Sequence, residues 1–399
     1  MVGAGWAGLA AAVRGVQRGA QVTLLEMAAT AGGRACSLKG RDNGAHILIG
    51  AYTQTLALMR TVGVDADALL ARLPLDLRDD TGAGLALPGG PPALAFARGV
   101  MGWRELTLHQ RLALLAQALR WRVTGFTCAP DVTVADWAAT LPAPARDHLM
   151  APLCLAALNT PPTQASAQVL LRVLHDALFA GPGSADLLLP RAPLSALLPE
   201  PALGWLARQG AELRLGQRSQ HLEPADGGWA VDGQRFDAVI LATPWGEAAR
   251  LAAPHAPAWA QAARALAPAA IATVWLHAPA ARWPRAMLAL RGGPAQFGFD
   301  LGALNGPRGD YALSVSGAGA EPVADAVRRQ FMAAFNVTAT VVAARTQRRA
   351  TFACTPGLSR PCAAVAPGLW AAGDYVQGPY PATLEGAVRA GLAAAEAAV

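Results

Sequence analysis

Charged residues are scarce in this 399-residue sequence, and lysine is nearly absent. Asp, Glu, Lys and Arg make up only 15% of the chain, and Lys39 is the only lysine among 33 basic residues. The basic residues form no tight cluster with interleaved aromatic residues, and no nucleic-acid-binding motif is present. The net charge of +6 therefore does not indicate a protein that binds nucleic acid. It is compatible with a protein that rests on an anionic membrane surface.

Paired cysteines and long apolar runs are also missing. The five cysteines are scattered, and none belongs to a Cys-x-x-Cys pair. An odd number of widely spaced cysteines favours free thiols in a reducing compartment over a disulfide framework or a zinc site. No run of about 20 uninterrupted apolar residues occurs, so we expect no simple membrane-spanning helix. Because the start shows no signal-peptide pattern, we expect a cytoplasmic protein, either soluble or peripheral on the inner face of the membrane.

Hydrophobic residues, in contrast, are abundant at 53% of the chain. Together with the length, this predicts a large core and either two domains or one elaborated domain.

The chain opens on a glycine motif in the segment "MVGAGWAGLAAAV". Gly3, Gly5 and Gly8 have the Gly-x-Gly-x-x-Gly spacing of a nucleotide-binding turn between a strand and a helix. The first glycine permits a tight turn, the second lets the backbone approach a pyrophosphate, and the third allows close packing of helix and strand. The predicted helix then offers free N–H groups to the phosphates. This spacing alone is weak evidence in a chain with 41 glycines.

A carboxylate in the expected place strengthens the interpretation. The segment "AQVTLLE" predicts a short buried strand that ends at Glu26, about 20 residues after the turn. A carboxylate there can accept hydrogen bonds from the adenosine ribose of a dinucleotide. The alternative is an ordinary surface acid after a strand.

Only Met1 and Val2 precede the turn, although the strand before such a turn lies centrally in a parallel sheet. A shortened central strand loses hydrogen bonds on both sides. We therefore expect the natural chain to begin several residues earlier.

A third motif follows in "AGGRACS", where Gly32 and Gly33 permit a close chain path and Arg34 can neutralise a diphosphate. With these residues the chain resembles the superfamily of flavin-dependent amine oxidases and phytoene desaturases. The C-terminal segment "LWAAGDYVQGPYPATLEGAVRAG" is similar to the second flavin signature of that superfamily.

The resemblance implies an α/β fold and FAD as cofactor. The expected architecture is a Rossmann-like FAD-binding domain of the GR2 type with a second, mixed α+β substrate domain. In this sequence Gly373 and Asp374 are implied to contact the ribityl-diphosphate, although Asp374 alone is also explained as a turn cap. A helix start is implied beside the flavin ring, where it stabilises negative charge on a reduced flavin. The residues implied at the cofactor are Gly3, Gly5, Gly8, Glu26, Gly33, Arg34, Gly373, Asp374, Thr383, Leu384 and Glu385.

The pattern along the chain predicts that both domains are discontinuous. Residues 211–242 contain several short strand-like runs, whereas the stretch from Trp245 to about Ala344 is helical and mixed in character. The expected FAD-binding domain comprises residues 1–75, 204–250 and 355–399, and the expected substrate-binding, membrane-facing domain comprises residues 76–203 and 251–354.

Further stretches resemble one branch of the superfamily, the hydroxysqualene dehydroxylases of bacterial hopanoid and squalene biosynthesis. They are "DNGAHILIGAYTQTLALMRTVG", "PLCLAALNTPPTQASAQV", "SADLLLPRAPLSALLPEP" and "RATFACTP". The resemblance implies reductive removal of the hydroxyl group of hydroxysqualene, a C30 isoprenoid, to give squalene. Upstream isoprenoid synthases are implied as possible partners.

This chemistry implies hydride delivery to an allylic carbon while hydroxide leaves, so the departing oxygen needs protonation or a hydrogen bond. His46 is the expected acid because the pKa of histidine allows protonation near neutral pH, and Asp42 is expected to orient it or to help bind the cofactor. A packed histidine bonded to the backbone is the alternative. Cys154 and Asn159 are expected to line the substrate tunnel, with core packing as the alternative for Cys154.

Residues 101–126 combine a leucine stripe with Trp103, Trp121 and several arginines, a pattern typical of interfacial segments. Internal packing of the stripe in a helical insertion is the alternative.

Other functions stay open at this point. A carotenoid-type desaturase would run the flavin in the opposite redox direction on a similar substrate. An amine oxidase commonly has an aromatic residue where this chain has Thr383. A non-catalytic lipid-binding flavoprotein would hold lipid without flavin turnover. The sequence contains no evident second nucleotide-binding motif for NAD(P)H, so the electron donor that reduces the flavin is not identified.

Overall fold

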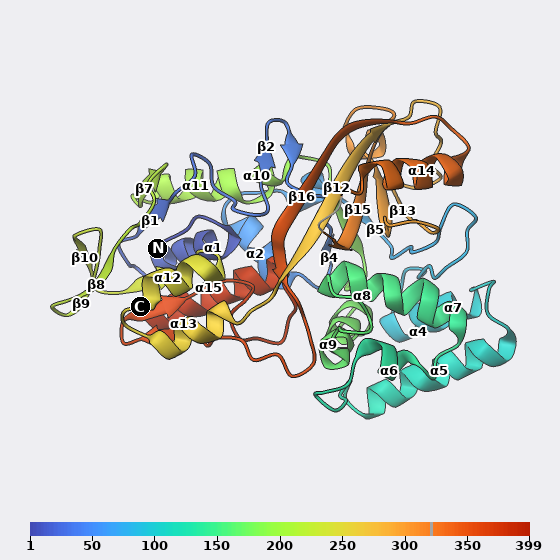
Figure 1. The fold of residues 1–399 in the computed structure, drawn as a ribbon, viewed down its shortest axis with the longest axis horizontal. Helices are drawn as coiled ribbons and strands as arrows, with labels where there is room; N and C mark the ends of the chain where they lie inside the picture. The colour runs from blue at the N-terminus through green and yellow to red at the C-terminus, as the bar shows by residue number, and fades with distance from the viewer. Residues whose placement is uncertain (320–321) are drawn as a thin grey trace.

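The computed structural model describes residues 1–319 and 322–399. Both chain ends lie in one half of the molecule, and the other half combines a five-stranded sheet with a group of helices (Figure 1). Within the described residues no helix has both the length and the apolar character needed to cross a bilayer.

A parallel sheet forms the centre of the first half. Strand β1 (Thr23–Glu26) pairs with β7 (Glu212–Leu215), and β11 (Val239–Leu241) pairs with β18 (Leu369–Ala371). Val2 forms parallel bridges to both β1 and β11, so this one residue joins the two pairs. The segment before the glycine turn and a strand from near the C-terminus therefore lie in one sheet.

Two helices from opposite ends of the chain pack together beside this sheet, α1 (Trp6–Gln17) and α15 (Leu384–Ala398) (Figure 1). Their close approach depends on small residues, because a Cβ on Gly391 would lie 2.1 Å from the carbonyl oxygen of Ala7. Helix α1 buries Leu9 and Val13 in a core shared with α11 (Pro199–Arg208). The remaining elements of this half are α2 (Thr53–Thr61), α3 (Ala66–Leu69), α10 (Leu194–Leu197), α12 (Trp245–Ala252), α13 (Pro257–Arg264), β2 (Ser37–Leu38), β3 (Arg41–Asp42), β8 (Leu222–Ala225), β9 (Gly228–Val231), β10 (Gln234–Phe236) and β17 (Ala364–Ala366).

The second half contains an antiparallel sheet in the order β13-β14-β15-β12-β16. Its longest strands, β12 and β16, run beside each other and reach back toward the parallel sheet (Figure 1). Helix α14 (Ala324–Phe335) packs on this sheet through Val327 and Phe331. The five strands are β12 (Pro268–His277), β13 (Met287–Ala289), β14 (Phe297–Asp300), β15 (Asp310–Ala318) and β16 (Thr340–Phe352).

A group of helices and a small antiparallel sheet complete the second half (Figure 1). The helical elements are α4 (Pro92–Met101), α5 (Leu108–Val123), α6 (Val134–Ala138), α7 (Ala143–Ala145), the π-helical turn η1 (Arg146–Met150), α8 (Ala151–Leu158), α9 (Ala167–Leu178) and the 3₁₀ turn η2 (Gly302–Leu304). The small sheet consists of β4 (Leu48–Ile49), β6 (Leu187–Pro190) and β5 (Leu70–Leu73).

The predicted division into two domains stays a prediction. Leu188, Leu194 and Leu206 share one hydrophobic core with Leu9 of α1. The first two of these leucines fall in the range 76–203 that the sequence assigned to the substrate domain, so this part of the chain packs with the nucleotide-binding elements.

Candidate functional site

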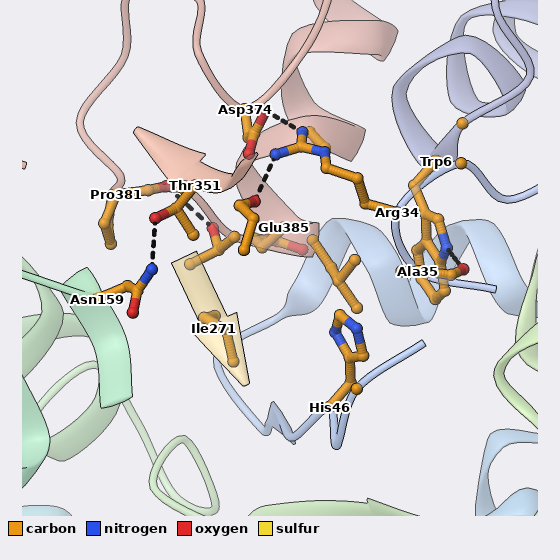
Figure 2. A pocket seen from close by; sticks show the side chains of 18 of the residues that line it. Trp6, Arg34, Ala35, His46, Asn159, Ile271, Thr351, Asp374, Pro381 and Glu385 are labelled. Carbon is orange, nitrogen blue, oxygen red and sulfur yellow. Dashed lines mark hydrogen bonds and ion pairs between the residues drawn. The ribbon is translucent and has the colours of Figure 1, made fainter. Parts of the chain in front are cut away.

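One large cavity lies between the two halves of the molecule. Its volume is about 740 Å³, within the range of small-molecule sites. Its lining includes the first turn of the chain, the start of α15, helices α8 and α9, and strands of the five-stranded sheet. In Figure 2, Arg34 contacts Asp374 on one side of this cavity and Asn159 contacts Thr351 on the other, with Ile271 and His46 lower in the view.

The three glycines of the opening turn have three different environments. Gly3 has φ +104°, and a Cβ there would lie 2.6 Å from the carbonyl oxygen of Ala242. A Cβ on Gly8 would lie 1.8 Å from the carbonyl oxygen of Gly3, so only glycine allows α1 to pack on the turn. A Cβ on Gly5 would meet nothing within 4 Å and would enter the cavity. Protein packing therefore explains Gly3 and Gly8, whereas Gly5 leaves space for a ligand.

Helix α1 begins directly at this space. Gly5 is its N-cap and provides no side-chain hydrogen bond, and the first turn contains no acidic residue. The amide of Leu9 is the first to bond within the helix, to the carbonyl oxygen of Gly5. The preceding N–H groups and the positive end of the helix dipole are available to an anion such as a diphosphate.

Glu26 ends β1 and is buried beside the turn. Its Oε2 accepts a hydrogen bond from the amide of Ala4 (2.7 Å), and its Oε1 accepts one from the amide of Ala28 (2.8 Å). Each carboxylate oxygen keeps a further lone pair, so the group can also accept from ribose hydroxyls. The two amides fix the orientation of the carboxylate against the cavity.

Arg34 joins the two flavin-like motifs, which are about 340 residues apart in the sequence. Its Nη2 donates to Oδ1 of Asp374 (2.6 Å), and its Nη1 donates to the carbonyl oxygen of Ala350 (2.6 Å). Gly33 has φ +60°, and a Cβ there would lie 3.3 Å from the Cα of Gly5. A Cβ on Gly373 would lie 2.6 Å from the ring of Tyr375. The predicted residues of both motifs thus meet at one wall of the cavity.

The predicted helix start near the C-terminus is present. Thr383 is the N-cap of α15, and its hydroxyl accepts a hydrogen bond from the amide of Gly386 (3.0 Å). Leu384 begins the helix, and both residues line the cavity. Glu385, which also lines the cavity, is turned toward α2. It accepts bonds from Thr55 N (2.9 Å), Thr55 Oγ1 (2.7 Å) and Arg389 Nε (2.7 Å). Its carboxylate therefore fastens α2 to α15.

Several polar atoms at the cavity are buried and have no hydrogen-bond partner among the described residues. A buried polar atom without a partner costs about 1–3 kcal/mol, so native proteins rarely leave such atoms unpaired. Four of them lie on residues that line the same cavity, which fits a ligand rich in hydrogen-bonding groups, such as FAD. These atoms are Asn43 Oδ1, Ser219 Oγ, Thr243 Oγ1 and the Tyr375 hydroxyl.

The geometry at His46 favours the alternative of a packed histidine bonded to the backbone. Its side chain lines the cavity, and Nε2 lies 3.3 Å from the carbonyl oxygen of Asn43. Burial lowers the pKa of His46 below its usual value, and the Asn43 carbonyl and the Asp42 charge offset this only in part. The imidazole is therefore neutral near pH 7 and is not a strong proton donor there.

The role expected for Asp42, to orient His46 or to help bind the cofactor, stays a prediction, and its observed bonds lead elsewhere. Oδ1 of Asp42 accepts hydrogen bonds from the hydroxyl of Ser37 and from the amide of Leu194 (2.9 Å). This carboxylate binds the start of α10 to the β2–β3 hairpin. It is not among the residues that line the large cavity, so its observed contacts are structural.

The two residues predicted for the tunnel differ. Cys154 is fully buried, its thiol contacts the carbonyl oxygen of Thr160 (3.3 Å), and burial raises its pKa to about 12. It does not line the cavity, which favours the alternative of core packing. Asn159 does line the cavity, but its Nδ2 donates to Thr351 Oγ1 (2.9 Å) and its Oδ1 accepts from the amide of Gly317 (2.6 Å). The amide joins α8 to β15 and β16.

The far side of the cavity is apolar. Helices α8 and α9 and strands β12, β13 and β14 supply it with aliphatic and aromatic side chains. The principal ones are Leu153, Ala157, Leu170, Val173, Leu174, Ala177, Leu178, Ile271, Met287, Phe297 and Phe299. Such a wall suits a long hydrocarbon ligand.

A polar cluster on α9 interrupts the helical part of this wall, and the sequence analysis missed it. Asp176 of α9 accepts hydrogen bonds from Arg172 Nε (2.8 Å) and His175 Nδ1 (2.7 Å), and it contacts the hydroxyl of Tyr380. Burial and the Asp176 charge raise the pKa of Tyr380, so its hydroxyl stays protonated. Asp176 and Tyr380 both line the cavity. They are 204 positions apart, and no sequence motif links them.

Comparison with known proteins agrees with this geometry. A family model described as flavin-containing amine oxidoreductase matches residues 6–399, and the chain belongs to this family. The hydroxysqualene dehydroxylase of Rhodopseudomonas palustris is 29% identical over 99% of this chain and 97% of the relative. That of Sinorhizobium fredii is 29% identical over 100% of this chain and 97% of the relative. The chain is thus similar to proteins of that name, which confirms the resemblance found in the sequence.

Solved structures support the fold. An oxidoreductase from Methanosarcina mazei superposes with a TM-score of 0.73 over 99% of both chains, at 16% sequence identity. The predicted α/β fold is confirmed. Membership of the family also makes the protein an FAD-dependent oxidoreductase, as the glycine turn and the C-terminal motif predicted.

Proposed function

We propose that this flavoprotein removes the hydroxyl group of hydroxysqualene reductively and forms squalene. One observation carries the proposal, namely that the cavity with the dinucleotide-type turn at one end continues along an apolar wall at the other. The names of the similar proteins support the same substrate class. In the reaction, the C–O bond breaks and the oxygen takes up a proton and leaves as water. Reduced FAD, when bound, would supply the hydride for the new C–H bond.

The cofactor-binding residues follow from the polar half of the cavity. The N–H groups at the start of α1 and the guanidinium of Arg34 would hold the diphosphate, with the open space at Gly5 for close approach. Glu26 would accept from the adenosine ribose. Asp374 and the start of α15 at Thr383 would lie along the ribityl chain and the flavin ring, where the helix dipole stabilises negative charge.

The apolar half would hold the hydrocarbon chain. Hydroxide leaves an allylic carbon with development of positive charge, and water would capture such a carbon. Side chains such as Leu174, Phe297 and Phe299 exclude water from this region and contact the isoprenoid.

The departing oxygen needs a proton donor in this apolar region, and His46 is neutral there. We assign the role to Tyr380, which lines the cavity and whose hydroxyl keeps its proton near neutral pH. Arg172, which lies against the Tyr380 ring at 5.4 Å, and Asp176 would fix the orientation of this hydroxyl. A positioned proton donor of this kind contributes about 10²–10⁴ to a rate.

A substrate that partitions into lipid also implies contact with a membrane. The proposal therefore includes peripheral association with the inner face of the cytoplasmic membrane and supply of substrate by upstream isoprenoid synthases.

Product analysis tests the reaction. Purified protein with bound FAD is reduced anaerobically with dithionite, mixed with hydroxysqualene and quenched after a single turnover. We expect squalene in an amount equal to the flavin that is reoxidised. Unchanged alcohol beside competent reduced flavin would contradict the proposal. A parallel reaction of oxidised protein with squalene tests desaturation, and a desaturated product with reduction of the flavin would favour that chemistry instead.

A further inference from the structure

Helix α5 lies at the edge of the helical part of the second half (Figure 1), and an exposed apolar stripe runs along it. Monomeric proteins seldom expose several large aliphatic side chains in one row. The exposed fractions along α5 are 60% for Leu108, 54% for Leu112, 63% for Leu119 and 80% for Val123. Their spacing of four, seven and four positions places all four side chains on one face of the helix.

Neither of the simple expectations for residues 101–126 describes this face fully. Trp103 and Trp121 are buried, so the tryptophans are not interfacial anchors. Leu114 is fully buried with Trp121 on the other side of α5, which attaches the helix to the protein. The remaining stripe faces outward, and internal packing explains only the opposite face.

The neighbouring helix also exposes large apolar side chains. Helix α4 packs against α5 and exposes Leu94 (45%) and Met101 (42%). Two adjacent helices thus contribute large exposed apolar side chains. Under α4, Phe96 packs on Phe179 with 5.5 Å between ring centroids, and Phe179 directly follows α9, which lines the cavity. The same helical layer therefore contacts the cavity on one side and exposes apolar side chains on the other.

The charged residues along α4 and α5 and the segments that flank them are almost all basic. Residues 91–126 contain five arginines, at positions 98, 104, 111, 120 and 122, and one acidic residue, Glu105. Glu105 is bound to Arg291 (3.1 Å) and does not neutralise them. At about 100° per residue, Arg120 and Arg122 flank the stripe on opposite sides, and both are exposed. In the part of the chain that the structure describes, no carboxylate pairs with either of them.

We propose that the α4–α5 surface, defined by Leu94, Met101, Leu108, Leu112, Leu119 and Val123, binds an anionic lipid bilayer. The aliphatic side chains insert at the boundary of the acyl chains, and the flanking arginines contact anionic headgroups. A second copy of this chain would suit the surface less well, because a symmetric contact would place arginines against arginines. The biological purpose of the contact rests on the proposed function, since a bilayer is the source of a C30 isoprenoid. The test of membrane binding, however, involves no isoprenoid.

Vesicle sedimentation tests the surface with the full chain and bound FAD. We expect partition onto vesicles that contain phosphatidylglycerol, and at least about tenfold weaker partition onto pure phosphatidylcholine vesicles. The double variant Leu112→Glu/Leu119→Glu should reduce partition by about tenfold or more. The matched double variant Val341→Glu/Val342→Glu, at exposed valines of β16, should bind like the unaltered protein.

A second variant separates charge from apolar contact. Arg120→Gln/Arg122→Gln should weaken binding to anionic vesicles by about tenfold and remove most of its salt dependence. The flavin spectrum and melting temperature should stay unchanged in all variants, because the altered side chains are exposed.

Equal binding of Leu112→Glu/Leu119→Glu and unaltered protein would overturn the proposal, as would binding that does not depend on headgroup charge. A concentration-dependent dimer that the leucine variant abolishes would overturn it in favour of a second copy. Failure of vesicle binding with intact squalene formation would leave the proposed reaction standing.

Discussion

The two ends of the cavity satisfy their polar groups differently. Around the glycine turn, buried polar atoms of Asn43, Ser219, Thr243 and Tyr375 have no partner among the described residues. Along α8 and α9, the polar groups that reach the cavity are bonded to the protein, as the Asn159 amide shows. Since an unpaired buried polar atom is costly, the first end is incomplete without a polar ligand, whereas the second end is complete and suits a hydrocarbon.

Two buried glutamates repeat this difference. Glu26 is fixed by two backbone amides and keeps lone pairs directed at the cavity, whereas Glu385 is surrounded by donors from α2 and by Arg389. Burial of a carboxylate therefore does not identify a ligand contact in this protein. What distinguishes the two carboxylates is the number of hydrogen-bond donors that the protein already provides to each.

The largest expected effect comes from closing the open space at Gly5. Gly5→Val adds a side chain where the protein has no atom within 4 Å, so the fold should persist. The valine occupies the place of the diphosphate, and flavin should be lost almost completely. Absorbance of the purified protein near 450 nm, a range typical of flavins, and its melting temperature check this. Gly89→Val, at another glycine with open space around it, should keep its flavin.

Gly8→Ala provides the contrasting outcome. Its Cβ would collide with the Gly3 carbonyl oxygen, so the free energy of unfolding should fall by about 3 kcal/mol or more. If Gly5→Val also unfolded the protein, or if it bound flavin normally, the distinction between packing glycines and a ligand-facing glycine would be wrong.

The next effect concerns the polar cluster in the apolar half. Tyr380→Phe removes the proposed proton donor, and we expect the rate of squalene formation to fall by about 10²-fold at unchanged flavin content. Single-turnover kinetics with reduced protein measure this rate. Ser314→Ala, which removes another hydroxyl that lines the cavity, should change the rate by less than about threefold. Equal rates of squalene formation for Tyr380→Phe and unaltered protein would contradict the assignment of Tyr380 as the proton donor.

A smaller effect follows from narrowing the hydrocarbon end. Ala157→Phe places a ring beside Leu153 and Val173, and kcat/KM for hydroxysqualene should fall by about tenfold. Flavin content should stay constant, because the altered side chain lies in the apolar half. Ala157→Ser, of similar size, is the control. Loss of flavin in Ala157→Phe would contradict the separation of the cavity into two halves.

The two glutamates give a matched pair of substitutions. Glu26→Gln should weaken FAD binding by about tenfold, equivalent to about 1.4 kcal/mol, because a neutral amide accepts fewer hydrogen bonds from the ribose. Glu385→Gln should instead lower the free energy of unfolding by about 2 kcal/mol through loss of the charged contact with Arg389 and Thr55. Flavin titration and thermal unfolding distinguish these results. Identical behaviour of both variants would remove the contrast between a ligand-facing and a structural carboxylate.

Much of the nucleotide end was predictable from the sequence because local rules govern it. Gly3, Gly8 and Glu26 lie in one strand–turn–helix unit, where φ angles and close approach dictate the residue types. The meeting of Arg34 with Asp374 required the family resemblance, since no local rule brings together residues so far apart.

The other end was less predictable for physical reasons. Strands β12 to β15 lie in a stretch interpreted as helical and mixed, because alanine-rich segments such as "PAAIATVWLH" have no clear alternation of polar and apolar residues. The role of Asp42 depends on a tertiary contact with Leu194, which no spacing reveals. That of Cys154 depends on how the turn after α8 folds back, so that the Thr160 carbonyl oxygen meets the thiol. The Asp176–Tyr380 contact joins two segments through the fold alone.

The smallest expected effect is the pH dependence of stability that results from the burial of His46. Because burial lowers the pKa of His46 in the folded protein, the unfolded chain takes up the proton first as pH falls below about 6.5. The folded state therefore loses stability relative to a His46→Gln variant between about pH 6.5 and the lower folded pKa, by up to about 1.4 kcal/mol per pH unit. Urea unfolding of both proteins from pH 8 to pH 5 measures the difference, which should be constant above pH 7.5. A difference that instead favoured the unaltered protein at low pH would mean a raised pKa and would restore His46 as a proton donor.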